Sequence, residues 1–193
     1  MTQPHVSGPG SPVGAGVPSF GIRRAGARDA AVLAAVAAET FPLACPPDAL
    51  PASIADFIAK NLEVDSFTKY LADPERVLFL AEVDSEPAGY TMLVFGDPAD
   101  PDVAAVVPAR PTVELSKVYV REAHHGAGFA AALVAASVES ARERGARSVW
   151  LGVNQQNARA NRFYEKQGFA RVGTKKFLVG ERYEDDFVRA LEL

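Results

Sequence analysis

The sequence predicts a single α/β domain built around a mixed β-sheet. Over residues 112–168, strand-like and helix-like segments alternate, an order that is typical of a locally parallel sheet. Two pairs of consecutive strand-like segments, at 76–96 and 169–193, predict hairpins on either side of this unit and therefore a mixed sheet. Hydrophobic residues make up 48% of the 193 positions, which is enough to form a sizeable core.

The first eighteen residues, MTQPHVSGPGSPVGAGVP, are rich in Gly, Pro and Ser. This composition predicts a flexible tail at 1–18, followed by one domain over 19–193. In the first half of the domain we expect a strand at 20–26 and a helix at 30–41. Two short helices are expected within 51–74, followed by a hairpin of strands at 76–84 and 87–96. Asp29 can help to start the first helix, because Asp is favoured at helix N-termini.

The second half begins with a segment rich in proline and aspartate, 97–111, for which we expect a loop. Strands are then expected at 112–120 and 148–154, each followed by a helix, at 126–144 and 158–168. A hairpin of strands at 169–180 and 183–193 ends the chain. Gly145 and Gly168 stand where the two helices are expected to end, since glycine commonly follows the last helical turn.

Composition excludes several classes of partner. The formal net charge of −4 argues against nucleic acid, because proteins that bind it present basic surfaces to the phosphates. No run approaches the roughly 18 apolar residues that span a membrane, and the N-terminus lacks the pattern of a secretion signal. The single cysteine, Cys45, excludes an internal disulfide framework. We therefore expect a cytoplasmic protein with no nucleic-acid and no membrane partner.

The junction VREAHHGAGFA, at 120–130, joins a strand to a helix through two histidines and two glycines. A helix N-terminus presents unpaired N–H groups and a partial positive charge, which suit a phosphate. Gly126 and Gly128 let the backbone approach a bulky anion, and Ala130 keeps the first turn clear. The Gly-Lys-Ser/Thr ending of a phosphate loop and the G-x-G-x-x-G dinucleotide fingerprint are both absent. Pyrophosphate binding and a tightly packed turn both remain open.

A second motif, N-x-x-A-x-x-F-Y-E-K-x-G-F at 157–169, follows the next strand. Together with HHGAGFA it resembles the GNAT superfamily of N-acetyltransferases, and the element order agrees over 20–193. The family's first motif, Gln/Arg-x-x-Gly-x-Gly/Ala, matches His125, Gly128 and Ala130. His125 departs from the usual Arg or Gln, which should weaken cofactor affinity without abolishing it, because backbone amides do most of the binding.

The resemblance implies a GNAT fold with helices on both faces of a mixed, mostly antiparallel sheet. The sheet would be splayed between 112–120 and 148–154, with acetyl-CoA as co-substrate in the opening. Pantetheine would pair with the strand edge as an added strand would, and the pyrophosphate would meet the amides of 125–130. The implied cofactor residues are Val118, Tyr119, Val120, His125, Gly126, Ala127, Gly128, Phe129, Ala130, Asn157 and Tyr164.

Two residues are candidates for the chemistry of acetyl transfer. Tyr164 matches the tyrosine that in this family donates a proton to the leaving sulfur; otherwise it is a half-buried aromatic beside Phe163. Glu114 has the offset of the general-base glutamate in histone-acetylating members, and strand alternation predicts 114, 116, 118 and 120 on one face; otherwise it is a solvated strand charge. Ser116 is a weaker candidate, and a backbone N–H near Val118 would hold the oxyanion.

Three other residue types have simpler interpretations. His124 and His125 are adjacent and lack a third ligand at a suitable spacing, so we expect no metal. Cys45 has no identifiable partner base, which favours a small buried residue near the acceptor over an acyl-carrying nucleophile. Trp150 lies on an apolar strand and is expected in the core.

The acceptor amine is less well defined. The resemblance implies a pocket formed by the first two helices, the 97–111 loop and the final hairpin, and the C-terminal pattern is similar to bacterial polyamine acetyltransferases of the spermidine type. Seven acidic residues could attract a polycation: Asp97, Asp100, Asp102, Glu181, Glu184, Asp185 and Asp186. We favour a solvated face instead, balanced by Lys175, Lys176 and Arg182.

Several alternatives stay open for the acceptor and the activity. They are a protein N-terminus or lysine side chain as acceptor, a small amine in detoxification, and a module that senses acetyl-CoA without turnover. The sequence also leaves a homodimer open.

Overall fold

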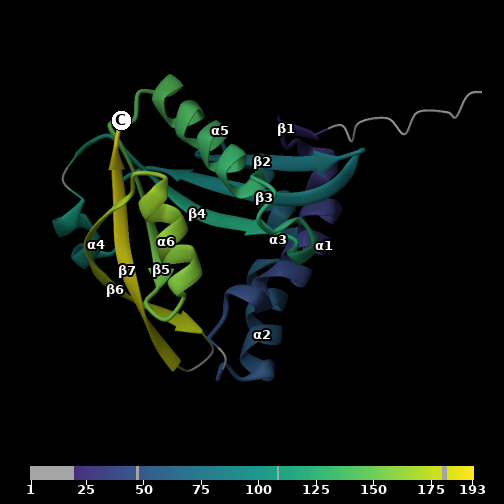
Figure 1. Ribbon diagram of the computed structural model, residues 1–193, viewed down its shortest axis with the longest axis horizontal. Helices are drawn as coiled ribbons and strands as arrows, with labels where there is room; N and C mark the ends of the chain where they lie inside the picture. The colour runs from purple at the N-terminus through teal and green to yellow at the C-terminus, as the bar shows by residue number, and fades with distance from the viewer. Residues whose placement is uncertain (1–19, 47, 108, 180–181) are drawn as a thin grey trace, which may run out of the picture.

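The computed structural model describes residues 20–46, 48–107, 109–179 and 182–193 (Figure 1). The tail expected at 1–18 and the acidic residue Glu181 lie outside these ranges. Within them, a seven-stranded sheet has the order β1-β2-β3-β4-β5-β7-β6. The strands are β1 (Phe20–Arg24), β2 (Arg76–Val83), β3 (Glu86–Phe95), β4 (Thr112–Val120), β5 (Ser148–Asn154), β6 (Ala170–Val179) and β7 (Arg182–Glu192). The pairing of β4 with β5 is parallel and the other pairings in this sheet are antiparallel, which confirms the predicted mixed, mostly antiparallel sheet.

The helices cover both faces of this sheet. They are α1 (Ala30–Thr40), α2 (Pro51–Asn61), α3 (Val64–Ala72), α4 (Pro101–Val106), α5 (Phe129–Glu143) and α6 (Ala158–Lys166), with 3-10 turns η1 (Ala27–Asp29), η2 (Phe41–Ala44) and η3 (Glu122–His124). On one face α1 and α3 pack on β2–β4 around Leu33, Phe67 and Leu80, all fully buried. On the other, α5 and α6 pack on β2–β5, with α5 in front of β2–β4 and α6 in front of β5 in Figure 1. No helix in the described part is long and apolar enough to cross a membrane.

The sheet opens in its middle, between β4 and β5. The two strands pair only at Thr112–Glu114, where Glu114 stands opposite Trp150, and they separate beyond that point. The predicted splay between 112–120 and 148–154 is therefore confirmed. A β-bulge occurs in β4 as well: Met92 of β3 pairs with Lys117 and Leu93 with Leu115, which leaves Ser116 as the extra residue.

Two predicted elements differ from the structure. The segment 97–111 contains a helix, α4, because Asp100 caps it by accepting from the Asp102 N–H at 2.9 Å and Pro101 occupies its first turn. The apolar side of α4 packs against Trp150. Trp150 is only 5% exposed, which confirms that it is a core residue. The helix expected from residue 126 begins only at Phe129, because Gly126 and Gly128 both have positive φ.

Candidate active site

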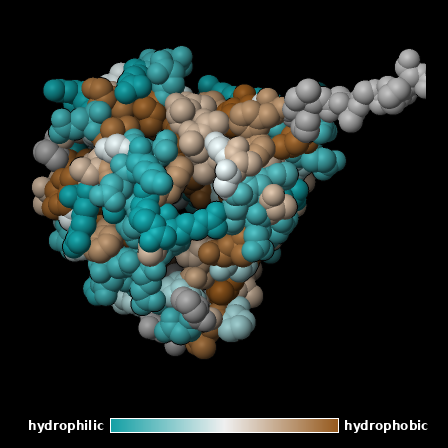
Figure 2. All heavy atoms as spheres, in the orientation of Figure 1, coloured by the Kyte–Doolittle hydropathy of each residue, from teal (hydrophilic) through white to brown (hydrophobic). Residues whose placement is uncertain are grey.

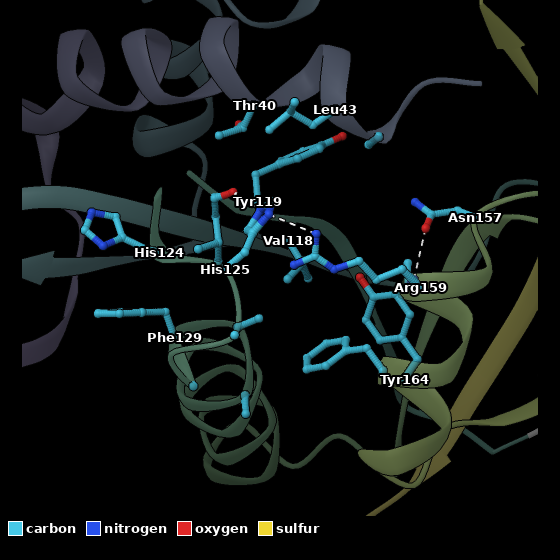
Figure 3. A pocket seen from close by; sticks show the side chains of 18 of the residues that line it. Thr40, Leu43, Val118, Tyr119, His124, His125, Phe129, Asn157, Arg159 and Tyr164 are labelled. Atoms are coloured by element: carbon cyan, nitrogen blue, oxygen red, sulfur yellow. Dashed lines mark hydrogen bonds between the residues drawn. The ribbon is translucent and has the colours of Figure 1, made fainter. Parts of the chain in front are cut away.

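Two cavities meet at the open middle of the sheet. The larger, of about 430 Å³, is lined by the β4–α5 loop and is called the loop cavity; Figure 3 shows its side chains. The second, of about 220 Å³, is lined by three carboxylates, Glu114, Glu184 and Asp186, and is called the carboxylate cavity. On the face seen in Figure 2, a hollow at the middle of the molecule is bordered by hydrophilic residues beside and below it and by more apolar residues above it. The residues that line both cavities are Ala44, Val118, Tyr119, Asn157, Ala160 and Tyr164.

The β4–α5 loop offers bare main chain to the loop cavity. Gly126 and Gly128 adopt φ values of +83° and +88°, and a Cβ added at either position would meet no atom within 4 Å. In α5 the first N–H with an acceptor one turn back is that of Ala132, which donates to the Gly128 carbonyl at 3.0 Å. The N–H groups just before it stand at the positive end of the helix dipole. This arrangement suits a bulky anion.

His125 and Arg159 form a polar bridge across the loop cavity (Figure 3). Nε2 of His125 lies 2.8 Å from the Val120 carbonyl, and Nδ1 lies 2.9 Å from Nη1 of Arg159. A guanidinium can only donate, so Nδ1 accepts and the proton of the neutral ring sits on Nε2. Arg159 thus brings a positive charge to the loop, and the sequence analysis missed it. Its position two residues after Asn157, within the second motif, was the available signal.

The edge of β4 faces the opening beyond the bulge. Arg121 N–H donates to the Ala88 carbonyl on β3 at 2.8 Å, so alternate residues Val118 and Val120 direct their backbone polar groups away from β3. The Val120 carbonyl is taken by the His125 ring. The remaining edge groups can pair with an extended, amide-rich ligand.

Tyr164 stands where the two cavities meet. Its ring contacts Phe163 and Phe169 edge to face, with centroids 5.1 and 5.9 Å away. Burial raises the pKa of the Tyr164 hydroxyl above its usual value near 10, so the group keeps its proton at neutral pH. The structure therefore supports both the half-buried aromatic and the proton donor that the sequence suggested.

A buried polar clamp fixes α6, which carries Tyr164, to the sheet. The side-chain amide of Asn161 donates to the carbonyls of Asn154 and Asn157, at 3.0 and 2.9 Å. Nε of Arg189, on β7, donates to the side-chain oxygen of Asn161 at 3.1 Å. Asn157 also caps α6, since its side chain accepts from the Ala160 N–H at 2.9 Å.

The bulge corrects the prediction that 114, 116, 118 and 120 share one face. Glu114 pairs with Val94 and Val118 with Thr91, and these two partners are three residues apart on β3, hence on opposite faces. Glu114 therefore lies on the face of Lys117 and lines the carboxylate cavity, whereas Val118 packs against the α5 side. Strand alternation failed because the extra residue, Ser116, reverses the phase of β4.

The carboxylate cavity has buried charges that the sequence analysis assigned to a solvated face. Glu184 and Asp186 of β7 are each only 7% exposed, so that interpretation is wrong for both. Burial raises the pKa of Asp186 to about 6; nearby Lys175 opposes this rise, while Glu184 and Asp185 add to it. Burial also lowers the pKa of Lys117 to about 8. Neither shift could be predicted from the sequence, because both arise mainly from burial, which depends on tertiary packing.

Several acidic candidates lie outside this cavity. Asp97 pairs with Arg110 at 2.9 Å, Asp100 caps α4, and Asp185 is exposed and forms an ion pair with Lys176. None of the described residues of 97–111 lines the carboxylate cavity, so the structure gives that loop no part in it. The loop instead packs through α4 over Trp150 at the other end of β5, where the sheet is still closed.

Cys45 and His124 line different cavities. Cys45 lines the carboxylate cavity, and burial raises the pKa of its thiol to about 11, which disfavours the nucleophilic thiolate. His124 lies against the Phe129 ring, with centroids 5.3 Å apart. Among the residues in the described ranges, no three His, Cys, Asp or Glu side chains gather as a metal site would require.

The cofactor residues implied by the resemblance are largely brought together. All of them line the loop cavity except Ala127, and Phe129 takes part through its backbone, because its ring packs against Phe20 and His124. The side chains that the sequence analysis missed come from α1, η2 and α6: Thr40, Leu43, Arg159, Phe163 and Gln167.

Comparisons with known proteins point to one family of enzymes. Residues 43–169 match the model of the acetyltransferase (GNAT) family. A protein of Mycobacterium tuberculosis described as an uncharacterized N-acetyltransferase is 47% identical over 165 residues, covering 86% of this chain and 98% of that protein. The crystal structure of the PaiA N-acetyltransferase of Thermoplasma acidophilum in complex with coenzyme A shares the fold, with a TM-score of 0.73 and 18% identity over 91% of this chain and 99% of that one. A ribosomal-protein-alanine N-acetyltransferase of Brucella melitensis gives a TM-score of 0.65 and 26% identity, covering 89% of this chain and 99% of that one.

Proposed function

Because the chain belongs to the GNAT family of acetyltransferases, we propose that it transfers the acetyl group of acetyl-CoA directly to a primary amine. The observation that carries this proposal is the meeting of the loop cavity with the carboxylate cavity at Tyr164. One cavity suits an anionic, amide-rich donor and the other a cationic acceptor. A direct transfer needs the two substrates to meet at one point.

The loop cavity fits the parts of acetyl-CoA. The open space over Gly126 and Gly128, the amides at the start of α5 and the charge of Arg159 suit its diphosphate. The edge of β4 at Val118 suits the amides of the pantetheine arm. Bound there, acetyl-CoA supplies the activated thioester carbonyl.

The residues of the chain then have distinct roles. A backbone N–H at the bulge near Val118 stabilises negative charge on the carbonyl oxygen. The protonated hydroxyl of Tyr164 donates to the departing sulfur. A carboxylate of the second cavity removes a proton from the acceptor ammonium, and Glu114 is the candidate that the family resemblance suggests.

We propose a small cationic amine as acceptor, because three carboxylates line the acceptor side. The likeness to a ribosomal-protein-alanine N-acetyltransferase makes a protein N-terminus the other acceptor to test. The raised pKa of Cys45 argues against an acetyl-cysteine intermediate, so intact-mass analysis with acetyl-CoA alone should show no stable adduct.

The test is to mix the purified protein with acetyl-CoA and, separately, spermidine, L-lysine and a peptide that begins with alanine, and to follow thiol release. Release with at least one amine, above the rate of hydrolysis, is expected. Calorimetric binding of acetyl-CoA without release for any amine would favour a sensor over an enzyme.

A further inference from the structure

Asp186 is a buried carboxylate in the wall of the carboxylate cavity. It is 7% exposed and makes no hydrogen bond or close ion pair with the described residues, although Lys175, opposite it on β6, attracts it from a longer distance. It stands opposite Asn154, the last residue of β5, where β5 has already separated from β4. Burying a carboxylate that no donor contacts directly is costly, so this position suits a cationic ligand.

The hydroxyl of Tyr119 lies near both Asp186 and the proposed proton donor Tyr164. Burial raises the pKa of the Tyr119 hydroxyl, and Tyr164, Cys45 and Asp186 are close enough to add to that rise. Asp186 and Tyr164 also line the same cavity. An amine held by Asp186 therefore lies within the cavity where the donor thioester ends in the proposed function.

We propose that Asp186 binds the ammonium group of the acceptor and takes its proton. This assignment rests on the proposed function. Asp186 accepts one proton from the ammonium, and the freed nitrogen lone pair forms the new C–N bond as the C–S bond breaks. The nitrogen then loses a second proton, which returns to the Tyr164 oxygen and replaces the proton that Tyr164 gave to the sulfur. The proton on Asp186 then leaves to solvent, so that the products are the amide and the free thiol of coenzyme A.

Glu114, the candidate suggested by the family resemblance, is less well placed for this step. It pairs with Trp150 at the closed end of the β4–β5 opening, below the bulge. It also lies near Lys117, whose positive charge it stabilises.

The surroundings of Asp186 set the pH at which it can act. The ionisable groups around it are Lys175 on β6, Glu184 and Asp185 on β7, Glu114, Lys117 and Tyr119 on β4, Tyr164 on α6, and Cys45 after η2. Their combined effect, with burial as the largest cause, raises the pKa of Asp186 to about 6. Asp186 is therefore ionised at pH 7 yet a much better base than an ordinary aspartate. Below pH 6 it gains a proton and loses its charge.

The test compares Asp186→Asn with Asp185→Asn, the same change one residue away on an exposed side chain that pairs with Lys176. With the amine of the panel that the wild type acetylates fastest, Asp186→Asn should lower kcat by about 100-fold and remove the fall of kcat/KM below pH 6. Asp185→Asn should stay within about twofold of the wild type. Coenzyme A should raise the Tm of both variants as it does for the wild type, which shows that fold and cofactor site are intact.

A second measurement does not need turnover. In protein with ¹³C-labelled aspartate, the carboxyl signal missing from Asp186→Asn should titrate near pH 6 and shift to lower pH when propylammonium is added. A midpoint near pH 4 that propylammonium leaves unchanged would overturn the proposal. An Asp186→Asn variant with the wild-type rate and pH profile would also overturn it. The same holds if the fall of kcat/KM below pH 6 is removed only by Glu114→Gln. A wild-type protein that releases no thiol with any amine would overturn the proposed function and this assignment together.

Discussion

The loop cavity and the carboxylate cavity are built in different ways, although they share Tyr164. The loop cavity uses mainly backbone from one continuous segment, 118–131, with side chains of α6 closing it. The carboxylate cavity uses side chains from four strands, α2 and the η2 region. A site made of local main chain depends little on the identity of its side chains. A site made of distant side chains depends on the phase of each strand.

The largest effect should come from Tyr164, one of the residues that line both cavities. Tyr164→Phe removes the proton donor and should lower kcat by about 100-fold, while the Kd for acetyl-CoA stays within about twofold. Steady-state kinetics and calorimetry check the two quantities. An unchanged kcat would remove Tyr164 from the chemistry and leave it as a packing residue.

The next prediction affects the loop cavity alone. Arg159→Gln removes the positive charge beside His125 and should raise the Kd for coenzyme A by about 10- to 150-fold, since hydrogen bonds to charged groups contribute about 1.5–3 kcal/mol. kcat at saturating acetyl-CoA should hardly change. The control is Arg162→Gln, an exposed arginine on the same helix. Equal Kd values for the two variants would mean that main chain alone binds the anion.

A third prediction concerns the main chain of the loop cavity. Gly128→Ala meets no atom but must adopt a φ of +88°, so it should lower the free energy of unfolding by about 1–2 kcal/mol. Thermal denaturation measures the change. Gly21→Ala, in extended backbone with equally open space, should not show this loss. Equal stability of the two variants would contradict a strained loop.

The smallest effect should appear on the acceptor side. The pKa of Lys117 is lowered to about 8 in the folded protein, so between pH 8 and 10.5 the unfolded chain binds more protons at this residue. The stability contributed here therefore rises with pH across that window. In Lys117→Met this rise, at most about 1.4 kcal/mol per pH unit, should be absent. Urea unfolding at several pH values measures it, and the exposed Lys69→Met should keep the wild-type slope.

The elements and the loop cavity followed from local patterns. Gly126 and Gly128 predicted the unusual turn before α5, and the second motif predicted α6 with Asn157 and Tyr164. Arg159 was missed because the motif was interpreted through its asparagine and tyrosine only. The helix α4 was missed because its Asp-Pro start was interpreted as loop composition.

By itself, the sequence determined the order of the strands and helices, the glycine loop and the family to which the chain belongs, because each depends on residues close together in the chain. Only the tertiary structure decided which carboxylates line the carboxylate cavity. The bulge at Ser116 reverses the face of β4, and burial on β7, between β5 and β6, raises the pKa of Asp186. Strand phase and desolvation arise from long-range packing, which no local pattern encodes.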